Sequence, residues 1–430
     1  MSEEATLDEF VGEESKDAVD VGSLQQLEES PVSEWTLNKL GSLLTLEYGD
    51  NLPSDSREVG EIPVFGSNGQ VDTHSEPAIN EPGIIMGRKG SIGEIEFSEH
   101  PFWPIDTTYY LTRNETDENL RFLYYLLQNI QLERLNAASA IPGLNRNDAY
   151  GLNALVPPLP EQRQIATVLY TVDRAIENAE KIDEQLQRVK KGAAQELFTC
   201  GLNNEDTQSH HIGDFPQSWE FDKISNLAEI ERGNTPRTSQ DEYYGGEIVW
   251  VTPDDLSDLN EDGNGKYISD SGRKLTPEGV ESSSLTVVEP DSIMFTSRSY
   301  GIGRTAICTV PAATNQGITA FECGESLDTE FFYYYLNYIM DYVVSISGGS
   351  TFPEISKTAT GNIDVPVPGI EEQKEIASLL SQFDEQLLHN REVTSQLKRL
   401  KRGLMQDLLS GTVRTTDTNI EVPDEIAQYG

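Results

Sequence analysis

Basic residues are scarce in this sequence. Its 430 residues include 31 Lys and Arg against 73 Asp and Glu, so that the net charge is −42 at pH 7. By sign alone, this charge excludes the basic groove of an ordinary nucleic-acid-binding protein. However, the acidic residues are spread along the chain beside 37% hydrophobic residues, which indicates a folded protein with an acidic surface. Such a surface suits a salt-rich, halophilic cytoplasm, where screening weakens self-repulsion, so the charge says little about the partner.

Cysteine and histidine are also rare, which argues against a disulfide framework and a metal centre. The three cysteines, Cys200, Cys308 and Cys323, form no C-x-x-C pair. The five histidines are scattered except for His210-His211, which we expect to be a solvated pair in a polar linker, and no metal site is predicted. The N-terminus has neither a basic segment nor an apolar stretch, so we expect a cytoplasmic protein.

The common catalytic motifs are missing. Gly263-Asn264-Gly265-Lys266 is followed by Tyr267 and is therefore not a phosphate-binding P-loop. Val156-Pro157-Pro158-Leu159 lacks the amide with which a DNA amino-methyltransferase would hold its target amine, and we interpret it as a rigid lead into a helix. Neither a G-x-S-x-G nor an H-E-x-x-H motif occurs. The chain is therefore predicted to be non-catalytic and to hold no cofactor of its own.

What the sequence does contain is a long internal repeat with an offset of 211 residues. The repeated motif is Pro157-x3-Glu161-Gln162-x2-Ile165-Ala166, which recurs as Pro368-x3-Glu372-Gln373-x2-Ile376-Ala377. Between 161–198 and 372–409, 13 of 38 positions are identical without a gap, where average residue usage predicts about two or three. The segments that precede these stretches diverge. The order is therefore a divergent module and a matched module, each present twice, and we expect the divergent modules to do different things.

Both matched modules, 156–202 and 367–412, are predicted to be long helices, with about 38 helical residues or roughly 57 Å each. Apolar residues recur every seven positions, which is typical of a coiled coil, and Asn390 stands where a polar residue fixes the register. The alternative, in which each helix packs only on its own globular module, stays open. The expected seam positions are Ile165, Val172, Ala179, Leu186 and Ala193 with Val168, Ala175, Ile182 and Val189, and in the second copy Ile376, Phe383, Asn390, Leu397 and Leu404 with Leu379, Gln386, Val393 and Leu400.

The divergent modules, 31–155 and 203–366, are predicted to be mixed domains of helices and strands. Short apolar runs bounded by Gly, Pro and Asp, such as 83–86, indicate strands between helical segments. The fold class is therefore α+β, with two separate domains. The acidic ends, 1–30 and 413–430, are expected to be mobile.

Two loops at corresponding places carry the candidate contacts to a partner. In Arg88-Lys89-Gly90-Ser91-Ile92-Gly93 the glycines indicate a turn, and its basic residues would reach DNA bases or phosphates. The counterpart of this loop is Arg298-Ser299-Tyr300-Gly301-Ile302-Gly303. A plain turn or a capped helix start with solvated charge is the alternative at each place. The candidate DNA-binding residues are Arg88, Lys89, Ser91, Asn145, Arg146, Arg298, Ser299, Tyr300 and Lys357.

A divergent module followed by Pro-x3-Glu-Gln-x2-Ile-Ala and a long helix, repeated twice, resembles the specificity (S) subunit of type I restriction-modification systems. The resemblance covers about 31–412 and is strongest at the two helix starts, 155–166 and 365–377. It is weaker at the entry to each globular module, where Gly213-Asp214-Phe215-Pro216-x2-Trp219 is echoed by Pro31-x3-Trp35.

This resemblance implies two target-recognition domains separated by an antiparallel coiled coil of two spacer helices with a pseudo-twofold repeat, each domain reading one half of a split double-stranded DNA sequence. Such a subunit is non-catalytic and does not bind membranes. It docks two modification subunits, which methylate adenine with S-adenosylmethionine, and, where they exist, two restriction subunits that use ATP and Mg²⁺. The residues that we expect in docking or in the spacer helices are Glu161, Gln162, Ile165, Glu372, Gln373, Ile376 and Asn390.

Two other functions stay open at this point. A scaffold that holds two copies of a protein partner without touching DNA would explain the repeat and the acidic surface, but not the divergence of the globular modules. An enzyme would need a nucleophile and a base that the sequence does not show. If DNA is the partner, the charge of −42 predicts recognition through base edges, shape and partner subunits more than through phosphates.

Overall fold

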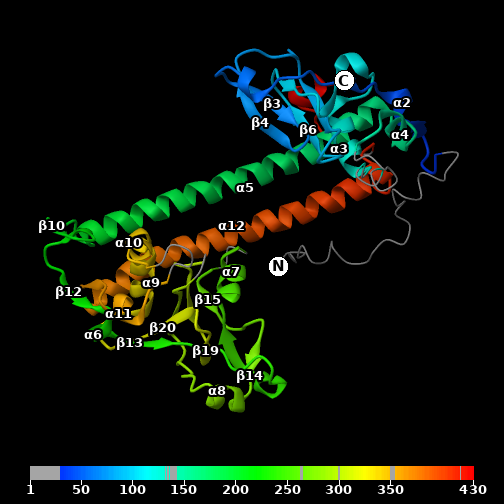
Figure 1. The fold of residues 1–430 in the computed structure, drawn as a ribbon. Helices are drawn as coiled ribbons and strands as arrows, with labels where there is room; N and C mark the ends of the chain where they lie inside the picture. The colour runs from blue at the N-terminus through cyan, green and yellow to red at the C-terminus, as the bar shows by residue number, and fades with distance from the viewer. Residues whose placement is uncertain are drawn as a thin grey trace, which may run out of the picture. The chain divides into compact units, whose positions relative to one another are not determined.

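The structure is a computed structural model that describes residues 30–130, 132, 135, 143–261, 265–298, 301–348, 354–416 and 418–430 (Figure 1). The expected acidic extension, 1–30, lies outside the described residues except for Ser30, and so do Ser299 and Tyr300 of the second candidate loop. Among the described residues, no helix combines the length and the apolar character that a membrane-crossing segment needs.

The described chain forms two compact units that share the two long helices, α5 (Leu159–Cys200) and α12 (Ile370–Ser410). The first unit lies within Met1–Asn178 and Thr394–Gly430, and the second within Ala179–Val393. This division differs from the predicted one, which set each helix apart as a spacer. The reason is burial: the start of α5 and the end of α12 pack into the core of the first unit, and the opposite ends pack into the core of the second.

The first unit combines a four-stranded antiparallel sheet, in the order β2-β8-β5-β6, with a three-stranded sheet, β4-β3-β7, as an α+β domain. Every residue of β5 is buried, as expected for an apolar run in the middle of a sheet. The elements are β1 (Thr36–Lys39), α2 (Leu40–Leu43), β2 (Glu47–Tyr48), β3 (Ile62–Gly66), β4 (Gly69–His74), β5 (Gly83–Gly87), β6 (Ile95–Ser98), β7 (Trp103–Pro104), β8 (Thr108–Thr112), α3 (Leu120–Asn129), α4 (Arg146–Tyr150), β9 (Asn153–Val156) and α13 (Asp424–Ala427), with 3₁₀ turns at Ser54–Ser56 and Arg113–Glu115.

The second unit has a five-stranded sheet, β13-β20-β17-β18-β15, and a three-stranded sheet, β16-β14-β19. It begins and ends as the first does, because β12 pairs with β21 just as β1 pairs with β9, in both cases next to the start of a long helix. The elements are β10 (Thr207–His210), β11 (Gly213–Pro216), β12 (Glu220–Lys223), α6 (Ile224–Leu227), β13 (Ala228–Arg232), β14 (Tyr244–Val251), α7 (Pro253–Glu261), β15 (Tyr267–Ile268), β16 (Lys274–Leu275), α8 (Pro277–Ser282), β17 (Ile293–Thr296), β18 (Thr305–Cys308), β19 (Ala312–Thr314), β20 (Ile318–Cys323), α9 (Thr329–Tyr338), α10 (Met340–Ser345), α11 (Lys357–Gly361) and β21 (Asp364–Val367), with a 3₁₀ turn at Asp241–Tyr243.

A buried glutamine joins the start of each long helix to its own globular domain. Gln162 accepts a hydrogen bond from the backbone N–H of Asn119, the N-cap of α3, at 2.9 Å. Gln373 accepts one from the backbone N–H of Asp328, the N-cap of α9, at 2.8 Å. Both amides also donate to the carbonyl of the proline five residues earlier, at 2.9 Å. The repeated Glu-Gln motif is therefore explained by bonds within the chain, since a buried amide needs its partners.

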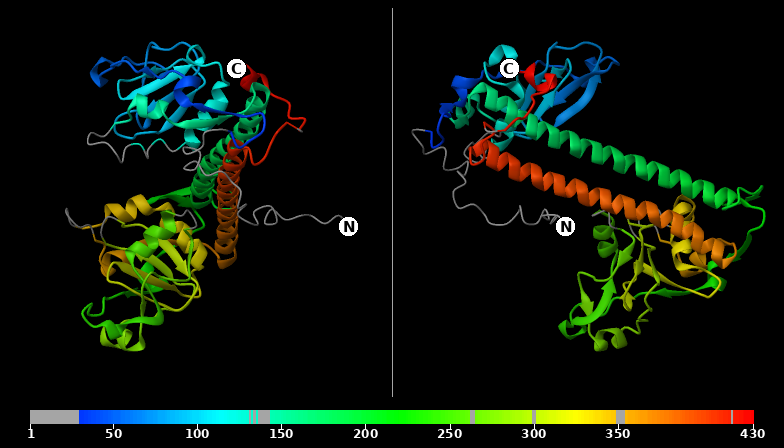
Figure 2. Two further views of the ribbon diagram at one scale, coloured as in Figure 1. Left: turned by 90° about the vertical axis from the view of Figure 1, so that its right-hand side faces the viewer. Right: turned by 180° about the vertical axis from the view of Figure 1, so that it is seen from behind.

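Within the second unit, α5 and α12 run in opposite directions (Figure 2). Asp183 pairs with Arg391 at 3.0 Å, and further along α5 Lys190 pairs with Asp384, which lies further back along α12. Asn390 donates from its side chain to a backbone carbonyl of α5 at 2.8 Å, as a polar residue between paired helices is expected to do.

In the first unit, an aspartate of α5 holds two side chains from other elements. Asp173 accepts a hydrogen bond from the hydroxyl of Tyr125 in α3 at 2.7 Å and pairs with Lys401 of α12 at 2.7 Å. Burial, followed by the negative charge of Asp173, raises the pKa of Tyr125, which stays a neutral donor. One carboxylate therefore joins both long helices to the globular domain.

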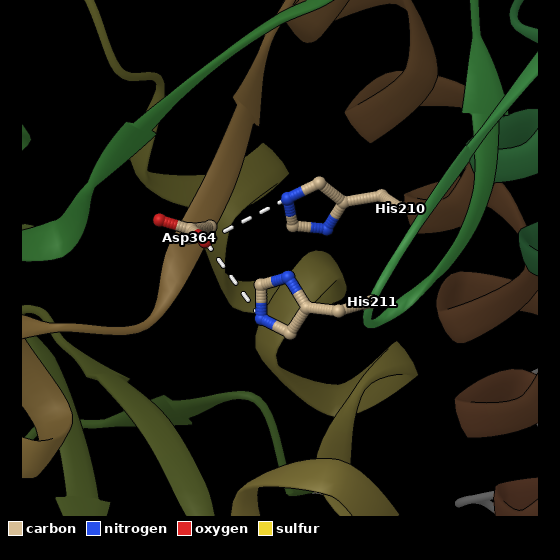
Figure 3. A group of neighbouring side chains, drawn as sticks. All are labelled: His210, His211 and Asp364. Atoms are coloured by element: carbon tan, nitrogen blue, oxygen red, sulfur yellow. Dashed lines mark ion pairs between the residues drawn. The ribbon is translucent and has the colours of Figure 1, made fainter.

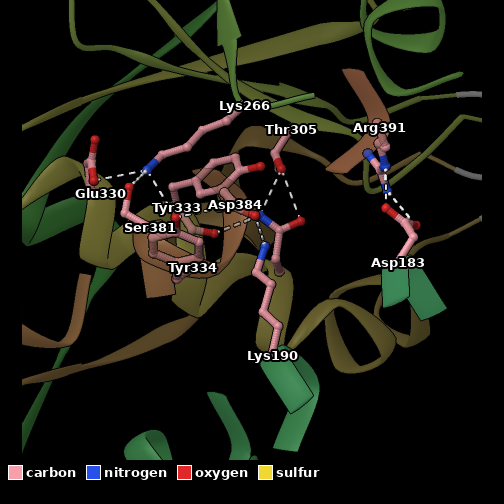
Figure 4. Close-up of polar contacts among 11 residues, drawn as sticks. Asp183, Lys190, Lys266, Thr305, Glu330, Tyr333, Tyr334, Ser381, Asp384 and Arg391 are labelled. Atoms are coloured by element: carbon pink, nitrogen blue, oxygen red, sulfur yellow. Dashed lines mark hydrogen bonds and ion pairs between the residues drawn. The ribbon is translucent and has the colours of Figure 1, made fainter. Parts of the chain in front are cut away.

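The second unit contains the same arrangement with the roles of the helices exchanged (Figure 4). Asp384 of α12 accepts from the hydroxyl of Tyr334 in α9 and pairs with Lys190 of α5. At the offset of 211, Lys190 corresponds to Lys401 and Asp173 corresponds to Asp384. The lysine of each copy thus pairs with the aspartate of the other copy.

The seam prediction is wrong at several positions of its second set, the one that begins with Val168 in α5 and with Leu379 in α12. The first set begins with Ile165 and Ile376. In the second set, Ile182, Val189, Leu379 and Leu400 are between 39 and 55% exposed. The buried face of α5 instead runs from the first seam to Leu169 and Ile176, each four residues after a first-seam position. Because an α-helix has 3.6 residues per turn, a strict seven-residue pattern drifts around a long helix, and the face that is buried follows the helix and not the heptad.

Glu161, in the first turn of α5, is the centre of a buried polar cluster in the first unit. Its carboxylate is 2% exposed and accepts hydrogen bonds from Arg414 at 2.7 and 2.9 Å and from Trp35 Nε1 at 2.9 Å. Burial opposes the charge, but the hydrogen bonds from Arg414 and Trp35 outweigh it and hold the pKa of Glu161 below its ordinary value. The segment after α12, predicted to be mobile, is therefore tied to the start of α5.

We expect Glu161→Gln to lower the free energy of unfolding by about 2–4 kcal/mol at pH 7, because the buried carboxylate that accepts from Arg414, Trp35 and Thr415 is lost. The folded-state pKa is depressed, so this stabilisation is complete above the unfolded-state value of about 4.3 and is lost as the pH falls through the folded-state pKa. Urea unfolding of both proteins from pH 7 downward measures the difference, which should shrink in acid. Glu184→Gln, at an exposed position of α5, is the matched control and should change stability by less than about 0.5 kcal/mol. A pH-independent difference would contradict the assignment.

Candidate functional site

A glycine at the end of a strand sets the backbone of the candidate site in each unit. Gly49 follows β2, and a side chain there would place its Cβ 2.2 Å from the carbonyl oxygen of Ile105. Gly233 follows β13, and its Cβ would lie 1.9 Å from the carbonyl oxygen of Thr314. Such contacts are impossible, so only glycine lets the strand end lie this close to the neighbouring loop. Tyr48 and Arg232, directly before these glycines, are thereby positioned at corresponding places.

In the first unit, two arginines flank the ring of Tyr48. The guanidinium carbon of Arg88 lies 4.9 Å from the ring centroid and that of Arg146 lies 5.2 Å from it. Arg88 donates to the carbonyl of Asp106 at 3.1 Å, and Arg146 donates to that of Leu46 at 3.1 Å. The ring of Tyr48 is 48% exposed. Together these groups form a cationic and aromatic surface of the kind that stacks on, or donates hydrogen bonds to, bases and phosphates.

The backbone brings together two segments that the sequence predicted separately. Leu144 donates its N–H to the carbonyl of Arg88 at 2.8 Å. The next residue, Asn145, caps α4 by accepting from the N–H of Asn147 at 2.9 Å, and Arg146 is the first residue of that helix. The capped helix start and the site are therefore the same feature, since the cap directs Arg146 toward Tyr48.

The remaining candidates of the first loop are held by polar neighbours. Lys89 pairs with Asp106 at 3.5 Å, and Ser91 donates to the side chain of Asn68 at 3.1 Å. Gly90 has a φ of 83° and Gly93 a φ of 81°, a conformation that favours glycine and that makes the predicted turn. The structure thus supports both the turn and the presence of basic residues beside it.

The second unit builds its site on the same frame with other side chains. Arg298 pairs with Glu354 at 3.6 Å, and Arg232 pairs with the same carboxylate at 2.9 Å. Ile355 donates to the carbonyl of Ser297 at 2.9 Å, the counterpart of the bond between Leu144 and Arg88. Lys357 is exposed and begins α11. The structure therefore places Arg298 and the start of α11 on linked segments, as in the first unit.

Sequence reasoning missed the residues at the two strand ends and the acids that hold the basic side chains. The signal for Tyr48 and Arg232 was available, because the match between Gly49 and Gly233 at an offset of 184 places them directly before equivalent glycines. No comparable signal marked Asp106 or Glu354. Both come from loops that approach the arginines only in the folded chain.

The expected docking residues lie mostly inside the chain. Gln162, Ile165, Gln373 and Ile376 are at most 1% exposed. Glu161 is buried with Arg414, and Glu372 accepts from the N–H of Leu202 at 3.4 Å. These contacts explain the residues without a partner subunit, and a docking role for them stays a prediction that the internal packing does not favour.

The expected solvated pair is wrong for His210, which is 21% exposed, whereas His211 is 53% exposed. His210 stacks on Phe221 with ring centroids 4.2 Å apart, and both imidazoles point at Asp364 (Figure 3). Their Nε2 atoms lie 3.6 and 3.7 Å from the same oxygen of Asp364. The linker prediction fails because the hairpin of β10 and β11 folds back onto β21, which carries the aspartate.

Comparison with known proteins decides the family. Residues 32–188 and 216–399 match the type I restriction modification DNA specificity domain. The chain belongs to this family. DNA target recognition is accordingly the function of this specificity subunit, and the alternative of a scaffold that never touches DNA is set aside.

Several specificity subunits and one of their solved structures are similar to this chain. The subunit is 27% identical to the type I restriction enzyme MjaVIII specificity subunit of Methanocaldococcus jannaschii, over 81% of this chain and 83% of that protein. It is 34% identical to the MjaIX specificity subunit of the same organism, where the match covers 46% of this chain and 45% of the relative. The EcoDI specificity subunit of Escherichia coli is 22% identical over 92% of each chain. The crystal structure of the type I restriction-modification S subunit from M. genitalium shares the fold, with a TM-score of 0.57, 19% identity, and coverage of 89% of this chain and 98% of that one.

We expect Gly49→Ala to lower the free energy of unfolding by about 2–4 kcal/mol, because the new methyl group cannot occupy the space of the Ile105 carbonyl. Gly192→Ala is the matched control. Gly192 lies within α5 with nothing within 4 Å of a Cβ, so the same change there should raise stability by up to about 1 kcal/mol. Urea unfolding measures both variants. Equal effects at the two positions would contradict the close approach at the strand end.

Proposed function

We propose that this specificity subunit reads a bipartite DNA target, with one half-site for each globular domain. The observation that carries the proposal is a shared frame that presents different side chains. In both units a strand ends at a glycine that lies close to a neighbouring loop. In both units a backbone hydrogen bond also joins the arginine loop to the segment that begins a short helix. The frame presents Tyr48, Arg88 and Arg146 in one unit and Arg232 and Arg298 in the other. Reading two different half-sites requires this combination of a common position and different chemistry.

We also propose that α5 and α12 act as the spacer between the two domains, as an antiparallel coiled coil with a pseudo-twofold repeat. The support is the exchange of lysine and aspartate partners between the two copies, with Lys401 on Asp173 and Lys190 on Asp384. Two identical polar contacts at repeated positions fix one register between paired helices, because a shift would leave charged groups without partners. A fixed register would give a fixed gap between the half-sites.

The subunit is proposed to be non-catalytic by itself and to dock two modification subunits, which would bring S-adenosylmethionine, and restriction subunits that would bring ATP and Mg²⁺. Two copies of one partner need two equivalent surfaces. Val189 and Leu400, which correspond at the offset of 211, are exposed apolar side chains on α5 and α12. They mark two equivalent exposed places on the helices where a partner could dock, which the buried Gln162 and Gln373 do not.

The first test is a map of methylated adenines in the host DNA with and without this gene. Loss of one split motif is the expected result and would identify the target. On that DNA, Arg146→Ala in the subunit assembled with its modification partner should weaken binding by about 5- to 150-fold, or ~1–3 kcal/mol.

Two further variants make this binding test specific. Tyr48→Phe keeps the ring and should bind nearly as wild type, whereas Tyr48→Ala should not. Arg174→Ala, at an exposed arginine of α5 that pairs with Glu177 one turn away, is the control and should leave affinity unchanged. Binding that is unaffected by both Arg146→Ala and Tyr48→Ala would remove this cluster from the interface, even if the methylation map identifies the motif.

The salt dependence of binding tests how the acidic subunit holds DNA. Lys89, Arg232 and Arg298 already pair with acids of the chain, which leaves fewer cations for phosphates. Six to ten phosphate contacts would give a slope of log affinity against log [KCl] of about −5 to −9. We expect a clearly shallower slope in a KCl titration with the cognate duplex. A slope within that range would show that phosphates dominate after all.

A further inference from the structure

Two strands that are distant in the sequence bring three metal-ligating side chains together in the second unit. His210 is the last residue of β10 and His211 is the next residue, in the turn to β11. Asp364 is the first residue of β21, the strand that leads into α12. Figure 3 shows both imidazoles directed at the carboxylate from the opposite strand. The cluster lies apart from the arginine sites, and DNA recognition does not account for it.

The spacing of the three groups fits a metal ion better than a hydrogen bond. The Nε2 atoms of His210 and His211 lie 3.6 and 3.7 Å from one oxygen of Asp364, which is too far for hydrogen bonds. One ligand atom from each residue lies within 4.8 Å of the other two. Zinc bonds of about 2.0–2.2 Å in a tetrahedron separate ligand atoms by about 3.4 Å. The two separations from the histidines to Asp364 are therefore within a few tenths of an ångström of this value, and the separation between the two histidines is at most 4.8 Å.

The ring of His210 is held by stacking and not by hydrogen bonds. Its side chain is only 21% exposed, and neither ring nitrogen makes a hydrogen bond with the described residues. Stacking on Phe221 with an interplanar angle of 2° holds the ring in its present orientation. The ring is therefore held by stacking, and its Nε2 atom, which faces Asp364 without a hydrogen bond, is placed to bind an ion between the two side chains.

The other neighbours are compatible with an ion. Lys223 pairs with the second oxygen of Asp364 at 3.2 Å, which orients the carboxylate and leaves the oxygen that faces the histidines. The hydroxyl of Tyr342 lies 3.3 Å from Nε2 of His211, a long contact that metal binding would replace.

We propose that His210, His211 and Asp364 bind one Zn²⁺ ion, with water as the fourth ligand. Two imidazoles and a carboxylate form a donor set that zinc favours over Mg²⁺ and Ca²⁺, which prefer oxygen ligands alone. The ion joins the hairpin that follows α5 to the strand that precedes α12. It therefore ties together the two connections by which the second globular domain is attached to the long helices. The expected role is structural, because binding to the folded state stabilises that state.

The test is a zinc titration of the full-length protein after removal of metal with EDTA, read by competition with a chromogenic zinc indicator. Molar KCl in the buffer suppresses weak binding to the 73 acidic residues. One zinc ion per chain should bind saturably and raise the Tm of the protein. His210→Gln and His211→Gln should each weaken binding by at least about tenfold, since even the loss of an outer partner of a ligand costs about 10- to 100-fold.

A matched variant and a second metal make the result decisive. His100→Gln, an exposed histidine of the first unit, should bind zinc as the wild type does. Without metal, His211→Gln should have the Tm of the metal-free wild type, which separates loss of the site from loss of the fold. Cobalt in place of zinc should give the visible absorption of a four-coordinate ion in the wild type and not in His211→Gln. No saturable binding, or binding that both histidine variants retain, would overturn the proposal, whatever the methylation map shows.

Discussion

The structure depends on two partly buried carboxylates that each hold a lysine from the opposite long helix. Asp173 and Asp384 stand at equivalent positions of the repeat, and each also accepts a hydrogen bond from a tyrosine of its own globular domain. A partly buried charge is costly without its partners, so each contact favours one arrangement of the helix segments and the domain within its own unit. Within each unit, the contact holds the segments of both long helices against the globular domain.

The repeat supplies a frame, and the differences between its copies supply the chemistry. Gly49 and Gly233 make equivalent close approaches to backbone carbonyls, so the residue before each glycine is delivered to the same place. In one unit this residue is an exposed tyrosine between two arginines, and in the other it is an arginine paired with Glu354. Steric exclusion at the glycine is what allows the neighbouring side chain to vary while its position is kept.

The sequence predicted the general plan well and the polar partners poorly. The long helices, the two mixed domains and the arginine loops were all visible, because periodicity, turn residues and repetition are local signals. The seam of the helices was predicted from a strict heptad, and Ile182 and Val189 are exposed because the buried face follows the pitch of the helix. His210 and His211 looked like a solvated pair because nothing near them in the sequence indicates Phe221 or Asp364.

By itself, the sequence determined that this protein is a duplicated, acidic chain of helices and mixed domains that resembles a DNA specificity subunit. Those properties rest on composition, spacing and internal similarity, which are visible in the sequence itself. Only the tertiary structure decided which polar and aromatic side chains meet. These contacts are Arg88 and Arg146 at Tyr48, Glu161 at Arg414, Lys190 at Asp384, and two histidines at Asp364. The physical reason is that electrostatic and hydrogen-bonding contacts depend on distances of a few ångströms, and residues far apart in sequence acquire those distances only when the chain folds.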